Sequence, residues 1–76
     1  MTSSEIRLHS KLYRARAIDE AIDAVLTSFS DGITARRTRD GEYYVVEASG
    51  IAGEDATELL ADIADAALIL TVEKDH

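Results

Sequence analysis

Residues 33–49 read ITARRTRDGEYYVVEAS, and they carry the strongest local pattern in the chain. Residues 33–39 alternate weakly, and residues 42–49 strongly, between the two sides of an extended backbone, which predicts two β-strands. Between them, Asp40-Gly41 predicts a two-residue turn of type I′, which needs positive φ at both central residues. We therefore expect an antiparallel β-hairpin with these two residues at its tip.

This hairpin should have two different sides, because side chains alternate along a strand. One side is expected to carry Ile33, Ala35, Tyr44, Val46 and Ala48. The opposite side is expected to carry Thr34, Arg36, Thr38, Tyr43, Val45 and Glu47. The first set can pack beneath other elements, which leaves the second set open.

Upstream of the hairpin, the chain predicts a strand and then a helix. Residues 5–12 alternate, with Ile6, Leu8 and Leu12 on one side and Arg7, His9 and Lys11 on the other. From about Arg14, apolar residues recur every three or four positions, which predicts an amphipathic helix with the stripe Ile18, Ala21, Ile22, Val25 and Phe29. Acids lie in its first half, where the helix dipole favours them, and we expect it to end at Ser30-Asp31-Gly32.

Downstream of the hairpin, residues 50–53 predict a loop, and a second helix is expected to start near Glu54. Its inner stripe comprises Ala56, Leu59, Leu60, Ile63, Ala67 and Leu70. The end of this helix stays open, because residues 68–73 fit either a continued helix or a fourth strand. We favour the helix, since no Gly, Pro or Asn separates this stretch from the preceding residues.

The element order is strand–helix–strand–strand–helix, which predicts an α+β fold. Two helices on one face of an antiparallel sheet form a two-layer sandwich, and a right-handed crossover places the third strand between the first two. This is the split β-α-β arrangement, which becomes ferredoxin-like if the fourth strand exists. We expect one domain over residues 5–73, with a disordered tail at 1–4 and a short tail at 74–76.

Length and composition restrict the function. The chain has 76 residues and no cysteine, which excludes disulfides, thiolate metal sites and a cysteine nucleophile. We identify no signal peptide, and the longest apolar run, residues 66–70, is far too short to span a membrane. We therefore expect a cytoplasmic protein with no membrane partner.

Charge is distributed unevenly. Residues 1–39 carry seven basic and five acidic side chains, whereas residues 40–76 carry one basic and ten acidic side chains, and the net charge is −7. The overall sign disfavours nonspecific binding of nucleic acid. The asymmetry instead permits contact between unlike surfaces of two copies.

One face of the predicted sheet is a candidate binding surface. It is expected to carry Arg7, His9, Lys11, Arg36 and Tyr43. Basic side chains around an aromatic ring on an open sheet resemble the way RNA-recognition domains stack bases. The alternative function is therefore a ferredoxin-like binding module that uses this face for RNA or a peptide.

No group of residues predicts catalysis, a cofactor or a metal. His9 with Glu47 as a cross-strand neighbour is a weak ligand set, and the chain has no G-x-S-x-G motif. Gly50 and Gly53 precede Glu54 and Asp55, which would repel a phosphate. We expect a protein that is not an enzyme and binds no cofactor.

Two stretches together resemble a known family. The first comprises Leu12-Tyr13, then Ala17-Ile18 and Ala21, and then DGEYYVV at 40–46. The second is DIADAALILTVE at 62–73. Together they resemble the HxsD-like proteins, small companions of the His-Xaa-Ser peptide maturation system, over about residues 5–73. The chain has Ile63, Asp65 and Ala66 where the family's second helix is expected to have an aromatic residue and an Asn-Tyr pair. The resemblance implies an accessory protein whose radical S-adenosylmethionine partners carry out the chemistry, and it assigns no catalytic residue.

The expected function is thus a non-catalytic interaction protein that acts as a homodimer. On a helix with the inner stripe given above, Leu68, Ile69 and Val72 point to other sides. Large aliphatic side chains are costly to leave in water, and a two-fold contact between copies is the commonest way to cover them. These three residues are the candidate interaction surface. Possible further partners are the radical S-adenosylmethionine maturation proteins or their peptide.

Overall fold

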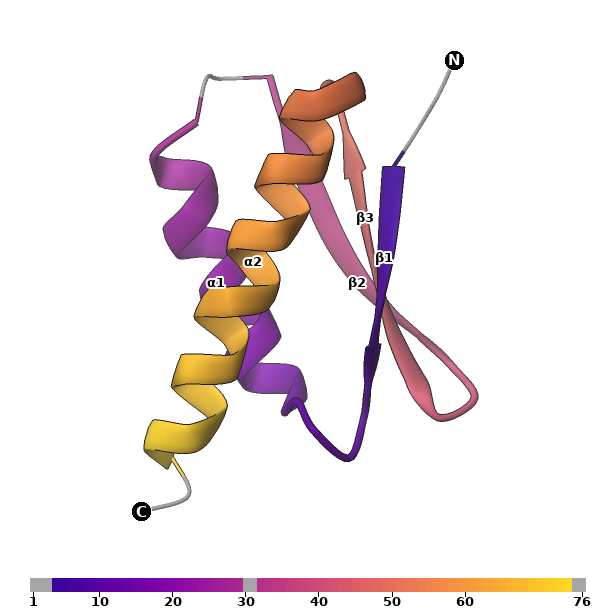
Figure 1. Ribbon diagram of the computed structural model, residues 1–76, viewed down its shortest axis with the longest axis vertical. Helices are drawn as coiled ribbons and strands as arrows, with labels where there is room; N and C mark the ends of the chain where they lie inside the picture. Colours follow the sequence, from indigo (N-terminus) through magenta and orange to yellow (C-terminus); the bar gives the residue numbers. More distant parts are fainter. Residues whose placement is uncertain (1–3, 30–31, 75–76) are drawn as a thin grey trace.

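The computed structural model describes residues 4–29 and 32–74. Its elements are β1 (Ser4–His9), α1 (Ala15–Thr27), β2 (Thr34–Asp40), β3 (Tyr43–Ser49) and α2 (Gly53–Lys74). The three strands form one antiparallel sheet in the order β1-β3-β2, and both helices lie on one side of it (Figure 1). The predicted α+β fold is confirmed, with the third strand between the first two.

The sheet has most of the alternation that the hairpin sequence predicts, but Val45, expected on the open side, is also buried, with only 9% of it exposed. Val46 and Ala48 of β3 and Leu8 of β1 are buried beneath the helices. They pack with Ile18, Ala21 and Ile22 of α1 and with Leu59, Ile63 and Ala67 of α2. The side chains of the alternate positions therefore lie on the opposite face of the sheet, which no helix of the described chain covers.

The hairpin turn differs from the prediction by one residue. Asp40 pairs with Tyr43, so the two loop residues are Gly41 and Glu42. Gly41 has φ +63°, and no non-glycine residue in the described parts of the chain has positive φ. The expected type I′ turn at Asp40-Gly41 is therefore wrong. Positive φ at the first central residue alone is the pattern of a type II′ turn, which favours glycine there.

The first strand is shorter than expected. It ends at His9, because the backbone N–H groups of Leu12 and Tyr13 both donate to the His9 carbonyl, at 2.9 and 3.1 Å, and turn the chain away from the sheet. Leu12, expected on the inner side, is 62% exposed in this turn. Lys11, expected on the open sheet face, also lies in the turn, so only Arg7 and His9 of that trio belong to the strand.

Helix α1 also ends earlier than expected, at Thr27. The N–H groups of Ser28 and Phe29 donate to the carbonyls of Val25 and Leu26, each three residues earlier. These 3₁₀-type hydrogen bonds tighten the chain just after the helix. Gly32 has φ +91° but lies beyond the helix, and Ser30 and Asp31 are outside the described residues. Asp19 and Glu20 are not in the first turn of α1, so the dipole does not account for them.

Helix α2 is continuous to Lys74, so residues 68–73 are helical and form no fourth strand. Its expected inner stripe is buried, apart from Leu70, which is partly buried. Thr71 is also buried, and its hydroxyl accepts a hydrogen bond from the Arg14 backbone N–H at 3.2 Å. This bond fixes the end of α2 to the start of α1. Within the described residues, neither helix has both the length and the apolar character that crossing a membrane requires.

Candidate interaction surfaces

The last two turns of α2 carry an exposed aliphatic surface. Leu68, Ile69 and Val72 are 43%, 58% and 54% exposed. On an α-helix these three positions fall within about 100° of one another, so they form one contiguous surface, which we name the α2 patch. The preceding turns carry several exposed acids, namely Glu54, Asp55, Glu58, Asp62 and Asp65. The outward side of α2 thus changes from acidic to apolar along its length.

The open sheet face carries both signs of charge. Arg7 pairs with Asp40, with Nη1 and Oδ2 2.9 Å apart, and both side chains are more than half exposed. Arg36 lies opposite Glu47, and Glu47 lies opposite Glu5. The basic residues of this face are thus accompanied by acids, because Asp40 pairs with Arg7, and Glu47, expected on the same face, lies opposite Arg36. This mixture does not favour a nucleic-acid surface.

His9 and Tyr43, both expected on this face, are in contact there. They are cross-strand partners, and their rings are 5.0 Å apart in an edge-on arrangement. The carboxylate beside His9 is that of Glu42, 3.9 Å from Nε2, rather than that of Glu47, which pairs with Glu5. In the described residues, no three His, Cys, Asp or Glu side chains are grouped so that they could hold a metal ion.

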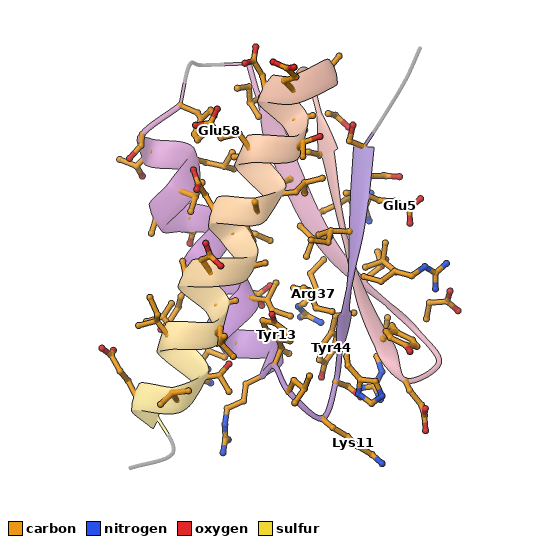
Figure 2. All side chains as sticks on the ribbon, in the orientation of Figure 1. Glu5, Lys11, Tyr13, Arg37, Tyr44 and Glu58 are labelled. Carbon is orange, nitrogen blue, oxygen red and sulfur yellow. The ribbon has the colours of Figure 1, made fainter. Side chains whose placement is uncertain are left out.

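Beneath the sheet, two arginines flank one tyrosine. The Arg37 and Arg39 guanidinium carbons lie 5.4 and 5.0 Å from the centre of the Tyr44 ring. Arg37 also donates two hydrogen bonds to the Asp19 carboxylate, at 2.9 and 3.3 Å, and so joins β2 to α1 (Figure 2). The hydrogen bond to Asp19 raises the pKa of Arg37, against the opposing effect of partial burial. Side-chain alternation places both arginines on the same side of β2 as the inward Ala35, but the sequence pattern does not indicate their contacts with Tyr44 and Asp19.

We expect Arg37→Ala to lower the free energy of unfolding by about 1 kcal/mol, because it removes a partly exposed ion pair and a cation–π contact. Urea denaturation measures this loss. Arg16→Ala, which removes the same charge from an exposed position of α1, should change stability by less than about 0.5 kcal/mol. Equal midpoints for the two variants would contradict a stabilising role for the Arg37 contacts.

A shallow hollow lies where α2 passes β1. Its volume is about 370 Å³, and its lining residues are Ser4, Glu5, Ile6, Thr57, Leu60 and Ala61. Ile6 is only partly buried here, whereas Leu8, two residues further along β1, is buried. The hollow therefore marks the part of the sheet edge that α2 covers least.

Comparisons of the chain with protein-family models, with curated proteins and with solved structures find no match. The molecule's own surfaces therefore supply the candidates for interaction. They are the α2 patch, the open sheet face with its mixed charges, and the incompletely covered edge of β1.

Proposed function

We propose that this chain is a non-catalytic interaction subunit that acts in the cytoplasm and self-associates through the α2 patch. The observation that carries the proposal is the exposure of Leu68, Ile69 and Val72 side by side at the end of an otherwise acidic helix face. Clustered large aliphatic side chains in water are typical of protein contact surfaces.

Burial of the α2 patch against a second copy removes aliphatic surface from water and so favours association. A fully buried large aliphatic side chain contributes roughly 1.5–3 kcal/mol, so covering the exposed half of three contributes roughly 2–4 kcal/mol per chain. The acids of α2 oppose such a contact. The basic residues of the first half of the other copy offset this repulsion when they approach the acids.

The resemblance to the HxsD-like proteins supports a more specific role. It implies that the subunit acts with partner proteins in a peptide maturation system, and that radical S-adenosylmethionine enzymes carry out the chemistry there. A gene for such an enzyme and a gene for a His-Xaa-Ser peptide beside the gene for this chain would support the role. A neighbourhood without either would contradict it.

We expect the unmodified protein to be a dimer at micromolar concentration and Leu68→Glu with Ile69→Glu to weaken that dimer severely. Each substitution removes aliphatic area and places a carboxylate in the contact, where its desolvation is unfavourable. Analytical ultracentrifugation over a concentration series gives the masses, and circular dichroism shows whether the variant is folded.

The matched control is Ala24→Glu with Ala52→Glu, which adds the same two charges at exposed positions outside the patch and should leave the dimer intact. If the glutamate pair unfolds the chain, alanine at 68, 69 and 72 removes the apolar area without adding charge. A folded monomer at high concentration for the unmodified protein would refute the self-association.

A further inference from the structure

Strand β1 has one unoccupied edge. It lies at the margin of the sheet in the order β1-β3-β2, so no described strand pairs with its outer side. This free edge adjoins the hollow between β1 and α2. An edge of this kind can pair with an extended segment of another chain, unless bulk or charge prevents it.

The hydrogen bonds of the neighbouring residues show which backbone groups point to the free edge. The Ser10 N–H donates to the Glu42 carbonyl at 2.8 Å, in the row after the His9–Tyr43 pair. In an antiparallel ladder, hydrogen-bonded and non-hydrogen-bonded rows alternate. The even residues of β1 therefore point their N–H and C=O groups towards β3, and the odd residues point theirs outward.

One of these outward groups is already in use. The His9 carbonyl accepts hydrogen bonds from the N–H groups of Leu12 and Tyr13, as its outward direction requires. The turn after His9 thus occupies the C-terminal end of this edge. Among the described residues, no partner occupies the N–H and C=O groups of Glu5 and Arg7, which are two donors and two acceptors in one short strand.

We propose that a second copy of this chain pairs with this edge through its own β1, antiparallel, with the two-fold axis at Ile6. In this register Glu5 of each copy lies opposite Arg7 of the other, and the two Ile6 side chains meet at the axis. The two hydrogen-bonded rows then use all four open groups of each chain. The result is one continuous six-stranded sheet.

Charge selects this register over its neighbours. An axis at Glu5 would place two glutamates opposite each other, and an axis at Arg7 would place two arginines opposite each other, and like charges in directly opposed positions destabilise a strand pair. An axis at Arg7 would also oppose Glu5 to His9, whose carbonyl is already bonded. Glu5-Ile6-Arg7 is self-complementary only when Ile6 is at the centre.

The space beside the strand fits the same occupant. The hollow of about 370 Å³ lies on the helix side of Ile6, where the side chain of Ile6 from a second copy would enter. On α2 the hollow is lined by two small exposed side chains, Thr57 and Ala61, together with the buried Leu60. Because Thr57 and Ala61 project little from α2, a second copy can approach the edge of β1.

This contact goes beyond the proposed function, because it uses a surface separate from the α2 patch. Two different two-fold contacts on one chain extend the assembly beyond the patch dimer at concentrations where both contacts form. The test is therefore carried out on the folded patch variant, either Leu68→Glu with Ile69→Glu or its alanine form. Any remaining association of that variant belongs to the edge.

Glu5→Arg in that background is expected to raise the dissociation constant about tenfold or more, because both opposed pairs become repulsive. The fold should be kept, since Glu5 lies opposite Glu47 within the chain and the substitution relieves a like-charge pair. The control is Glu58→Arg, the same charge change on α2, on the side away from β1 (Figure 2). It should leave the dissociation constant unchanged.

A mixing experiment makes the test specific to the register. Arg7→Glu alone should weaken association as Glu5→Arg does, whereas Glu5→Arg with Arg7→Glu in one chain should restore it. Equimolar Glu5→Arg and Arg7→Glu chains should form heterodimers, because each glutamate then faces an arginine. Ultracentrifugation and native mass spectrometry measure these outcomes.

The outcomes separate the two contacts. A patch variant that is monomeric at every concentration refutes the edge contact and leaves the α2 patch supported. A patch variant that still dimerises, and in which Glu5→Arg and Glu58→Arg have equal effects, refutes the proposed register. Dimerisation that is lost in Glu5→Arg and restored by Glu5→Arg with Arg7→Glu supports the register with its axis at Ile6. This conclusion holds whether or not the α2 patch also forms a contact.

Discussion

Gly50→Ala should leave the chain largely unfolded. Gly50 has φ +83°, where an L-residue costs about 1–2 kcal/mol, and an added Cβ would overlap the carbonyl oxygen of Gly32. The next contacts are Gly32 C at 3.2 Å and Ile33 Cα at 3.3 Å, also backbone atoms that cannot rotate away. A domain of this size has a total stability of only about 5–10 kcal/mol, so the loss is a large part of it. Thermal unfolding followed by circular dichroism measures the effect.

Gly41→Ala is the matched control. Gly41 has a similar φ of +63°, but an added Cβ would meet no atom within 4 Å. Its cost should therefore be the conformational term alone, about 1 kcal/mol. If both variants lose the same amount, the close approach of Gly50 to Gly32 contributes nothing to stability.

Ile63→Ala should lower the free energy of unfolding by about 2–5 kcal/mol. Ile63 is fully buried on the inner side of α2, where it packs in the cluster shared with α1 and the sheet. Removing its three outer carbons leaves a cavity that these rigid neighbours fill only in part. Urea unfolding at submicromolar concentration, where association contributes little, gives the value.

Ile69→Ala makes the same chemical change six residues further along the same helix, at a position that is 58% exposed. At submicromolar concentration it should alter stability by less than about 0.5 kcal/mol. Similar losses for the two variants would mean that the inner and outer sides of α2 have been exchanged.

Much of this fold follows from local patterns. Alternation in residues 42–49 identifies which side of β3 is buried, and the spacing of Ala56, Leu59 and Ile63 identifies the inner side of α2. The α2 patch follows from the same spacing, because residues that leave the inner stripe must face elsewhere. Periodicity suffices where one element packs against one layer.

Other features depend on contacts that no local pattern records. The β1 strand ends at His9 because its carbonyl accepts two N–H groups from the following turn, although the alternation in the sequence continues to Leu12. The hairpin loop shifts by one residue because Asp40 pairs with Tyr43 and leaves only Gly41 at positive φ. In both cases backbone hydrogen bonds, rather than the alternation of side chains, determine where the element ends.

The free edge was least accessible to sequence reasoning. Glu5 and Arg7 read simply as polar positions of a half-buried strand, and Arg7 was expected only on the open sheet face. Their backbone direction becomes known only from the strand order and from the bond between Ser10 and Glu42. The edge is thus a property of the assembled sheet.

The tie between Thr71 and Arg14 has a consequence for biosynthesis. The acceptor for the first turn of α1 lies in the last turn of α2, so the two ends of the helical layer join only when the C-terminal helix has left the ribosome. At about 5–20 residues per second, the 22 residues of α2 take roughly 1–4 s to synthesise. Until α2 has emerged, the sheet has only α1 to cover its apolar face, so a chaperone that shields β1 and β3 would act before that point.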